Sequence, residues 1–153
     1  MAFDQTKDLL KFLKPFPPEI QETALWLRKF VWDLYPDTNE LIYDNYNAVA
    51  FGWSPTDKVG HTFCLIAVGR SSQNVHFGFY WGAELNDTRK LLLGNGNQYR
   101  YVLVKSREDF PLPYIKKLLK EAYNNSPKQL IQGQTITKSI SAAKKTPAKK
   151  KKA

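Results

Sequence analysis

Residues 75–104 constrain the fold of this chain more than any other segment, and their sequence is VHFGFYWGAELNDTRKLLLGNGNQYRYVLV. Strand alternation over 75–81 predicts one apolar face, made of Val75, Phe77, Phe79 and Trp81. A second strand is expected over 99–104, after a sharp turn, a short helical turn and a glycine loop. The aromatic side chains of this segment are therefore expected mainly on the inner face of a sheet.

The rest of the chain carries helical and extended patterns, which together predict an α+β domain. Helices are expected over 4–14 with Asp4 as N-cap, from position 17 or 18 up to Pro36, and after the prolines at 111 and 113. The segment 40–53 is expected as two short strands or one bent strand. Residues 61–69 are apolar on both faces, which is typical of a central strand. We expect one domain over 1–125, followed at 126–140 by either a further edge element or a loose arm.

The long second helix presents a broad apolar surface. One stripe at helical spacing consists of Ile20, Ala24, Leu27, Val31 and Leu34. Trp26, Phe30 and Trp32 extend the apolar surface beyond that stripe. Two interpretations follow: the helix packs on the sheet under partial cover of the first helix, or its tryptophans line a groove for a partner or ligand.

Positive charge is concentrated at the C-terminal end of the chain. The net charge is +9, from 23 lysines and arginines against 14 carboxylates. Seven of these cations and no acid lie after position 137, namely Lys138, Lys144, Lys145, Lys149, Lys150, Lys151 and Lys152. Residues 1–137 thus carry a net charge of only about +2, with Lys116, Lys117 and Lys120 expected on the outside of the last helix. The tail at 141–153 is too polar to join a core and is expected to be disordered.

The lysine-rich tail has two interpretations. Lysines spaced by small residues resemble basic arms that bind nucleic-acid phosphates without reading sequence. Seven phosphate contacts would make log K fall with log salt with a slope of about −6. The other interpretation is a solubilising extension.

Motifs of the common enzyme classes are missing from the sequence, so we expect a non-enzymatic protein. There is no GxSxG elbow, no phosphate-binding GxxxxGK[ST] and no close Cys–His pair. The only two histidines, His61 and His76, would lie roughly 20 Å apart on a strand hairpin turning near 71–72, too far for one shared metal ion. Cys64 is the only cysteine, so no internal disulfide is expected. A single cysteine favours a reducing compartment, and the sequence has no secretory signal and no apolar run of about 20 residues. We therefore expect a cytoplasmic protein that does not enter membranes.

Two further groups are candidates for binding. Asp33, Asp37, Glu40 and Asp44 could form an open acidic edge suited to a hard or borderline cation, or an ordinary solvated rim. The Gly94-Asn95-Gly96-Asn97 loop is either a turn with positive φ or a nest of amides that binds an anion beside Arg100.

One set of residues resembles a known family. The segment 82–100 contains Gly82, Leu85, Asp87, Leu92, Gly94, Gly96 and Arg100. The earlier half contains Leu27-Arg28, the stop at Tyr35-Pro36 and the strand Glu40-Leu41-Ile42-Tyr43. Together they resemble the YdhG-like family of small bacterial proteins over about residues 7–123. The chain departs from the family at 44–47, where Asp-Asn-Tyr-Asn replaces the usual glycine and proline.

The resemblance implies both a fold and a function. It implies a frataxin-like antiparallel sheet of about five or six strands, covered by N- and C-terminal helices. Some members are regarded as iron chaperones, so it also implies iron handling or an accessory role in iron–sulfur cluster assembly, with iron or an iron-using protein as the partner. The carboxylates at 33, 37, 40 and 44 would be a thin form of the acidic ridge that frataxin uses, interrupted by Arg28 and Lys29. The alternative is a nucleic-acid-associated protein that uses the lysine tail.

Overall fold

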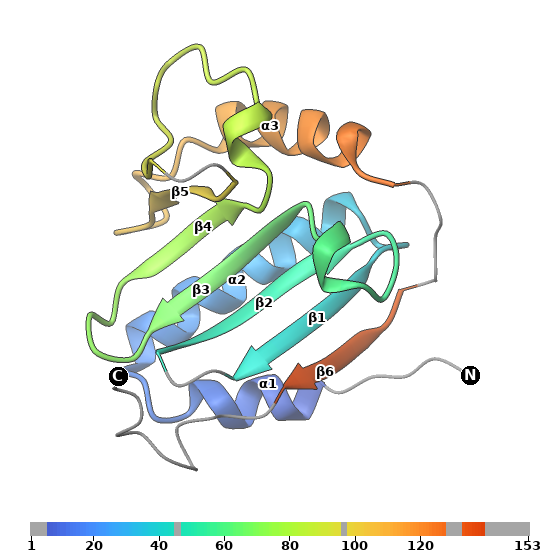
Figure 1. Ribbon diagram of the computed structural model, residues 1–153. Coiled ribbons are helices and arrows are strands. Elements are labelled where there is room, and N and C mark those ends of the chain that lie inside the picture. The colour runs from blue at the N-terminus through green and yellow to red at the C-terminus, as the bar shows by residue number, and fades with distance from the viewer. Residues whose placement is uncertain (1–5, 45–46, 96–97, 128–132, 140–153) are drawn as a thin grey trace, which may run out of the picture.

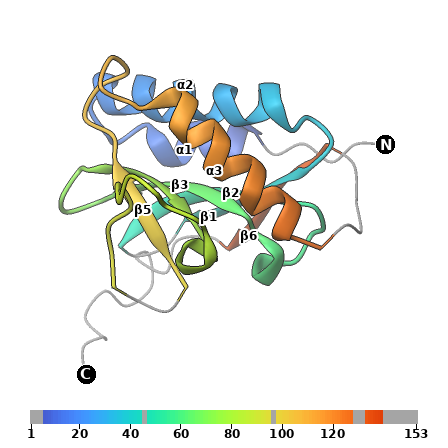
Figure 2. The ribbon, with the colours of Figure 1, turned by 90° about the horizontal axis from the view of Figure 1, so that it is seen from above.

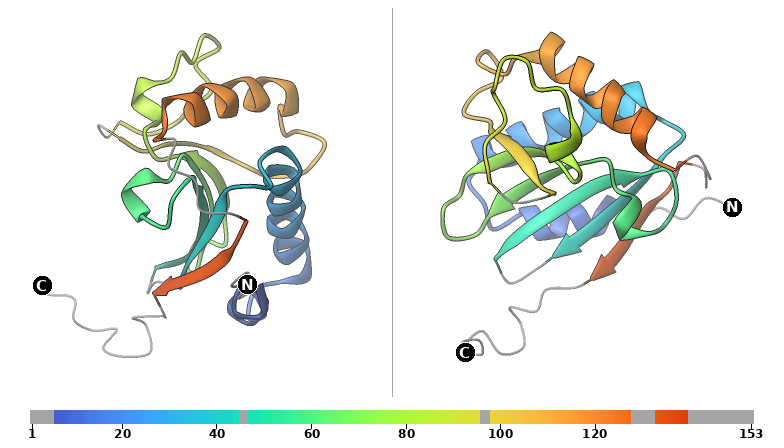
Figure 3. Two further views of the ribbon diagram at one scale, coloured as in Figure 1. Left: turned by 90° about the vertical axis from the view of Figure 1, so that its right-hand side faces the viewer. Right: turned by 45° about the horizontal axis from the view of Figure 1, so that its top comes forward.

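A computed structural model of the protein describes residues 6–44, 47–95, 98–127 and 133–139. These residues form an α+β fold with three helices and a six-stranded mixed sheet in the order β5-β4-β3-β2-β1-β6. Helices α1 and α2 lie behind the sheet in Figure 1, and α3 lies across its top. The edge-on view in Figure 3 shows the same layers, with α2 on one side of the curved sheet. The Asp4 cap and the tail at 141–153 lie outside the described residues.

The first two helices form where the sequence pattern predicts them. α1 spans Thr6–Leu13 and buries Leu9 and Leu13, but it leaves Leu10 nearly half exposed. α2 spans Pro18–Leu34 and begins with proline in its first turn, where no amide hydrogen is needed. The apolar surface of α2 packs within the molecule, because Trp26 and Trp32 make edge contacts with Phe110 and Trp53. The interpretation of α2 as a helix packed on the sheet is therefore confirmed.

The first four strands form an antiparallel meander. They are β1 at Asn39–Asp44, β2 at Ala48–Ser54, β3 at Cys64–Gly69 and β4 at Val75–Phe79. The predicted hairpin of β3 and β4 with its turn near 71–72 is confirmed, since Ala67 pairs with His76. β3 starts later than predicted, because His61 belongs to a short 3₁₀ helix at Val59–His61. A hydrogen bond of 2.8 Å between His61 Nδ1 and the Thr56 hydroxyl holds it there. β4 also ends two residues early, so Trp81 leaves the strand and is 38% exposed.

The two remaining strands occupy the edges of the sheet. β5 at Arg100–Leu103 pairs antiparallel with β4. β6 at Thr135–Ser139 pairs with β1 in the parallel direction, with an irregularity between Ile42 and Tyr43. The expectation of an antiparallel sheet is therefore confirmed for β1 to β5 and corrected for β6, and the segment 126–140 contains an edge strand. The parallel direction arises because the chain leaves β5, forms α3, and returns to the opposite edge of the sheet.

Helix α3 closes the core from above. It spans Leu112–Asn125 and buries Ile115, Leu118 and Leu119 against the rest of the core. Figure 2 shows α3 crossing over the sheet beside α2. Just before α3, Phe110 packs its ring against Phe77 of β4 at a centroid distance of 5.7 Å. The aromatic side chains of 75–79 thus belong to the inner face of the sheet, as predicted.

The sheet has one covered face and one open face. Phe51, Ile66 and Phe77 point toward the helices and are fully buried. Their neighbours on the other side are small or half-exposed, including Ala50 and Ala67. No α-helix of the described residues lies across this second side, which faces the viewer in Figure 1 and carries only the short 3₁₀ helix at Val59–His61 near one end. We call it the open face.

Candidate functional site

The predicted acidic edge contains a buried ion pair. Glu40 on β1 points to the helix side of the sheet and is 0% exposed. Its carboxylate accepts hydrogen bonds from Arg28 of α2, from Nε at 2.8 Å and from Nη2 at 2.7 Å. Charged side chains are rarely buried this deeply without such a partner.

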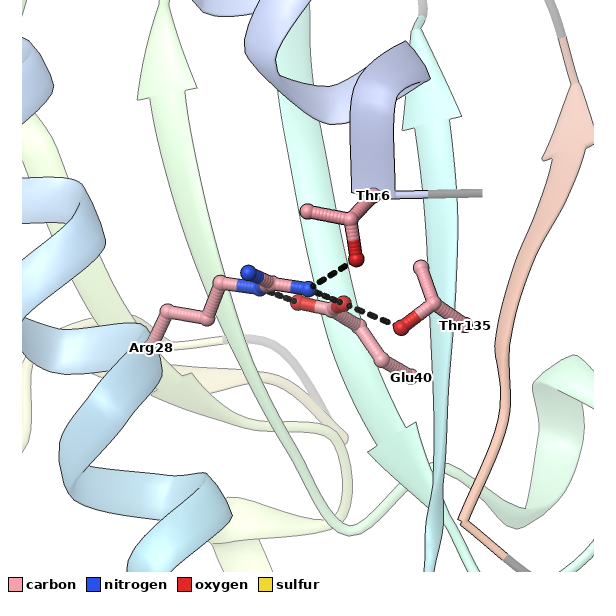
Figure 4. A network of polar contacts seen from close by, with 4 residues as sticks. All are labelled: Thr6, Arg28, Glu40 and Thr135. Atoms are coloured by element: carbon pink, nitrogen blue, oxygen red, sulfur yellow. Dashed lines mark hydrogen bonds and ion pairs between the residues drawn. The ribbon is translucent and has the colours of Figure 1, made fainter. Parts of the chain in front are cut away.

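Two threonines complete this network, which Figure 4 shows from close by. The Thr135 hydroxyl of β6 donates to Glu40 Oε1 at 3.0 Å, and Arg28 Nη2 donates to Thr6 Oγ1 at 3.0 Å. The four side chains come from α1, α2, β1 and β6. The network therefore ties β6 to three elements from the other end of the chain, and both Glu40 oxygens are already occupied.

The other three predicted carboxylates lie apart from Glu40. Asp44 at the end of β1 is 2% exposed and forms an ion pair with Arg70. Asp33 is exposed on α2 and pairs with Lys29 at 2.8 Å, one helical turn away. Asp37 is exposed between α2 and β1. Within the described ranges no three His, Cys, Asp or Glu residues are grouped so that they could hold a metal ion. Iron binding at these positions stays a prediction.

The glycine and leucine residues singled out in 82–100 serve the packing of this segment. A Cβ atom at Gly82 would lie 2.5 Å from the Arg100 Cβ, so only glycine permits this close approach. Gly94 has a φ of +106°, which agrees with the predicted turn, while Gly96 lies outside the described residues. Leu85 is half-buried against the core.

Asp87 is the polar centre of the same segment. Its Oδ1 and Oδ2 accept hydrogen bonds from the amides of Leu91 at 3.1 Å and Leu92 at 2.8 Å, and the Tyr114 hydroxyl of α3 donates to Oδ1. Burial acts to raise the pKa of Asp87, but the hydrogen bonds from Tyr114 and from these amides bring it below its ordinary value. Asp87 therefore acts as an ionised anchor that holds 86–92 against α3.

This anchoring holds together two segments that carry five cations, and we call these cations together the basic face. It consists of Arg89, Lys90, Lys116, Lys117 and Lys120, all of them exposed. The Arg89 guanidinium lies 5.0 Å from the centre of the Tyr114 ring. With about 100° between successive helical residues, the three lysines lie on one exposed arc of α3, and Glu121 lies between this arc and Tyr114 around the helix. The basic face therefore consists of two groups of exposed cations, one on 89–90 and one on α3, on segments that contact each other at Tyr114.

The nearby carboxylates are engaged in hydrogen bonds. Glu121 accepts the backbone amide of Asn86 through both oxygens, at 3.1 and 3.2 Å. The Asp87 carboxylate accepts hydrogen bonds from Leu91, Leu92 and Tyr114.

The charge is also distributed unevenly along the chain. Residues 1–60 hold six cations and nine carboxylates, whereas 61–137 hold ten cations and five carboxylates. The near-neutral body predicted from the sequence is thus divided into an acidic first half and a basic second half.

Sequence reasoning found only part of the basic face. The outward position of Lys116, Lys117 and Lys120 is confirmed by their exposure. The contribution of Arg89 and Lys90 was missed, because it depends on the contacts of Asp87 and Arg89 with Tyr114, 27 and 25 residues away. The clustering of basic residues after position 60 was the available signal. Among the tail lysines, Lys138 is exposed on β6, and the others lie outside the described residues.

Comparison with known proteins adds no relative. No family model, no curated protein and no solved structure matches the chain. None of the described helices combines the length and the apolar character needed to cross a membrane.

Proposed function

We propose that this protein is a non-enzymatic, nucleic-acid-associated protein that binds the phosphate backbone without reading its sequence. The observation that carries this proposal is the basic face, where two segments that contact each other carry five exposed cations. The seven lysines after position 137 add to it a second source of positive charge. Lysine and arginine side chains that neutralise phosphates supply most of the affinity of non-specific binding.

The aromatic side chains of the open face favour backbone contact over base stacking. The rings of His76 and Tyr101 are nearly parallel, with 4.3 Å between their centroids. The ring of Tyr101 also stacks on that of Tyr99, with 5.6 Å between the centroids. Both faces of the Tyr101 ring are therefore occupied by neighbouring rings. Proteins that bind single strands by stacking instead present aromatic faces to the bases. We infer that phosphate contacts, and not base contacts, determine the affinity.

The test compares variants of the full chain in a fluorescence anisotropy titration with labelled DNA of mixed sequence. The basic-face variant is Lys116→Gln/Lys117→Gln/Lys120→Gln. The matched control is Lys7→Gln/Lys11→Gln/Lys14→Gln, which removes three exposed lysines at the α1 end, opposite α3 in Figure 1. A third variant carries glutamine at the seven tail lysines.

We expect the basic-face and tail variants each to weaken binding and the control to bind nearly as the wild type. If the control variant and the basic-face variant lose equal affinity for DNA, the loss comes from the change in net charge. That result would contradict binding by a defined surface. Absence of binding by the wild type at low salt would refute the proposal.

Iron handling is the second function, and it rests on the family resemblance alone. Asp33 and Asp37 are the exposed members of the predicted set, so they are the side chains that an ion could reach without opening the core. Calorimetric titration of Fe(II) into the full chain and into Asp33→Asn/Asp37→Asn tests it. Heat that the double variant loses would support iron binding, and absence of heat in the wild type would exclude it.

A further inference from the structure

A pocket lies on the open face, away from the basic face. Its volume is about 240 Å³, and its floor is formed by Ala50 and Gly52 of β2 with Leu65 of β3. Gly52 pairs with Leu65 across the two strands, so both residues point to the open side of the sheet. Tyr43 and Tyr80 form walls from either side, and the loop that contains Val59 and Thr62 closes the end.

The pocket exists because its floor is made of small side chains. A Cβ atom at Gly52 would lie 2.8 Å from Thr62 Cγ2 and 3.0 Å from the Cys64 carbonyl oxygen. Because residue 52 has no side chain, Thr62 packs directly on the sheet beside the pocket. A larger residue at position 50 or 52 would fill the space.

The loop that closes the pocket is held by its own hydrogen bonds. The amides of Thr56 and Lys58 donate to Ser54 Oγ at 3.1 Å and to Thr56 Oγ1 at 3.0 Å. Asn39 Nδ2 of β1 donates to the Thr56 carbonyl oxygen at 3.1 Å, which ties the loop to the neighbouring strand. The end wall is therefore formed before any ligand arrives, as is usual for small-molecule sites.

Two hydroxyl groups of the pocket residues lack hydrogen bonds. Thr62 is only 2% exposed, and its Oγ1 has no hydrogen-bond partner within the described part of the chain. The same holds for the hydroxyl oxygen of Tyr43. Buried polar groups are paired in more than about nine cases out of ten, so two such groups beside one pocket indicate a missing partner.

The remaining lining determines the charge of that partner. No Asp, Glu, Lys or Arg side chain is among the seven residues that line the pocket. Burial, followed by the nearby Tyr80 phenol, raises the pKa of Tyr43, so its hydroxyl stays protonated at neutral pH. A charged ligand would lose its hydration here without gaining an opposite charge.

We propose that this pocket binds a small, uncharged aromatic molecule of one or two rings that bears a carbonyl or amide group. A cavity of about 150 Å³ is enough for benzene, so this pocket has room for one ring with a polar substituent or for two fused rings. The ring packs on Ala50, Gly52 and Leu65. The polar substituent pairs with the hydroxyls of Thr62 and Tyr43, which are buried in the free protein and turn toward the pocket when the ligand binds. This site is independent of the proposed nucleic-acid binding, because the two use different residues.

Benzamide and benzoate are suitable probes, since they have the same shape and differ in charge. Their binding to the full chain is followed by ¹H–¹⁵N correlation spectra at millimolar concentrations. We expect benzamide to shift the amide signals of residues 43, 52, 62 and 65, and benzoate to leave them unchanged. Equal shifts with benzoate, or no shifts with benzamide, would overturn the proposal.

Three variants locate the probe. Ala50→Leu fills the pocket and should abolish the benzamide shifts, whereas Ala48→Leu adds the same side chain two residues along β2, outside the pocket lining, and should keep them. Thr62→Val should weaken benzamide about fivefold, the equivalent of one hydrogen bond of about 1 kcal/mol. Thr62→Val should also leave the free protein at least as stable as the wild type, because the valine buries no unpaired hydroxyl.

The same variants separate the ligand from a bound water. A clear loss of stability in Thr62→Val with unchanged benzamide binding would show that the Thr62 hydroxyl is satisfied by water, and would refute its role. Benzamide shifts that persist in a folded Ala50→Leu would place the probe elsewhere and refute the pocket. If Ala50→Leu does not fold, the Thr62→Val affinity decides the question.

Discussion

The Arg28–Glu40 pair illustrates how a single buried charge depends on its partner. Arg28→Met would leave the Glu40 carboxylate fully buried with only the Thr135 hydroxyl to pair with it. We expect a loss of about 3–5 kcal/mol in the free energy of unfolding, measured by urea denaturation. Lys29→Met is the control, because its pair with Asp33 is exposed and should contribute less than about 1 kcal/mol. Similar losses in both variants would contradict the distinction.

His76 should make stability depend on pH near neutrality. Burial lowers the pKa of His76 below its ordinary value of about 6.5, so the unfolded chain takes up the proton first as the pH falls. The free energy of unfolding should therefore decrease from about pH 6.5 downward until His76 is also protonated in the folded protein. Denaturation at neutral pH and at about pH 5 should show this decrease in the wild type and a smaller one in His76→Gln. An equal decrease in both would assign it to other groups.

At this scale the sequence could not reveal which charges are buried. The carboxylates at 33, 37, 40 and 44 look alike in the sequence, and charged residues are mostly exposed. Glu40 and Asp44 alternate with Leu41 and Tyr43, so they point to the helix side of β1. They are buried because Arg28 and Arg70 reach them from α2 and from the end of β3, contacts that local patterns do not encode.

At the scale of elements, Asp87 holds the segment 86–92 against α3. Asp87→Asn should cost about 1–3 kcal/mol of unfolding free energy, because the uncharged amide cannot accept all three hydrogen bonds of the carboxylate. Asp57→Asn is a suitable control, since Asp57 is exposed in the 54–63 loop and should change stability by less than about 0.5 kcal/mol. Losses of equal size in the two urea denaturation curves would show that Asp87 is no anchor.

Elements with a strong local signal were predictable, and those defined by distant contacts were not. The prolines and the apolar stripe predict the position of α2, and the strand pattern on either side of the polar loop predicts the hairpin of β3 and β4. The weakly apolar segment of β6 gives no indication of its direction, which depends on the Thr135–Glu40 contact and on pairing with β1 across 95 residues. The start of β3 was wrong for a similar reason, because the Thr56–His61 hydrogen bond keeps His61 in the loop.

At the scale of the whole molecule, the fold separates two kinds of surface. One is the open face, where small side chains of β2 and β3 leave room for an uncharged ligand. The other is the basic face of α3 and 89–90, at the top of the molecule in Figure 1. The sequence predicted the uneven charge of the tail, but it could not predict this separation, because it depends on which side of the sheet the helices cover.

The salt dependence of DNA binding measures how much of this charge is used. Each phosphate that a cation neutralises on duplex DNA changes the slope of log K against log salt by about −0.9. Glutamine at all seven tail lysines should therefore reduce the slope by up to about 6, and the basic-face variant by up to about 3. The α1 control should keep the wild-type slope, since its three lysines lie at the opposite end of the molecule. Anisotropy titrations at several salt concentrations provide these slopes. A tail variant with an unchanged slope would show that the tail lysines make no phosphate contacts. The slope of the basic-face variant would then show whether the basic face makes them.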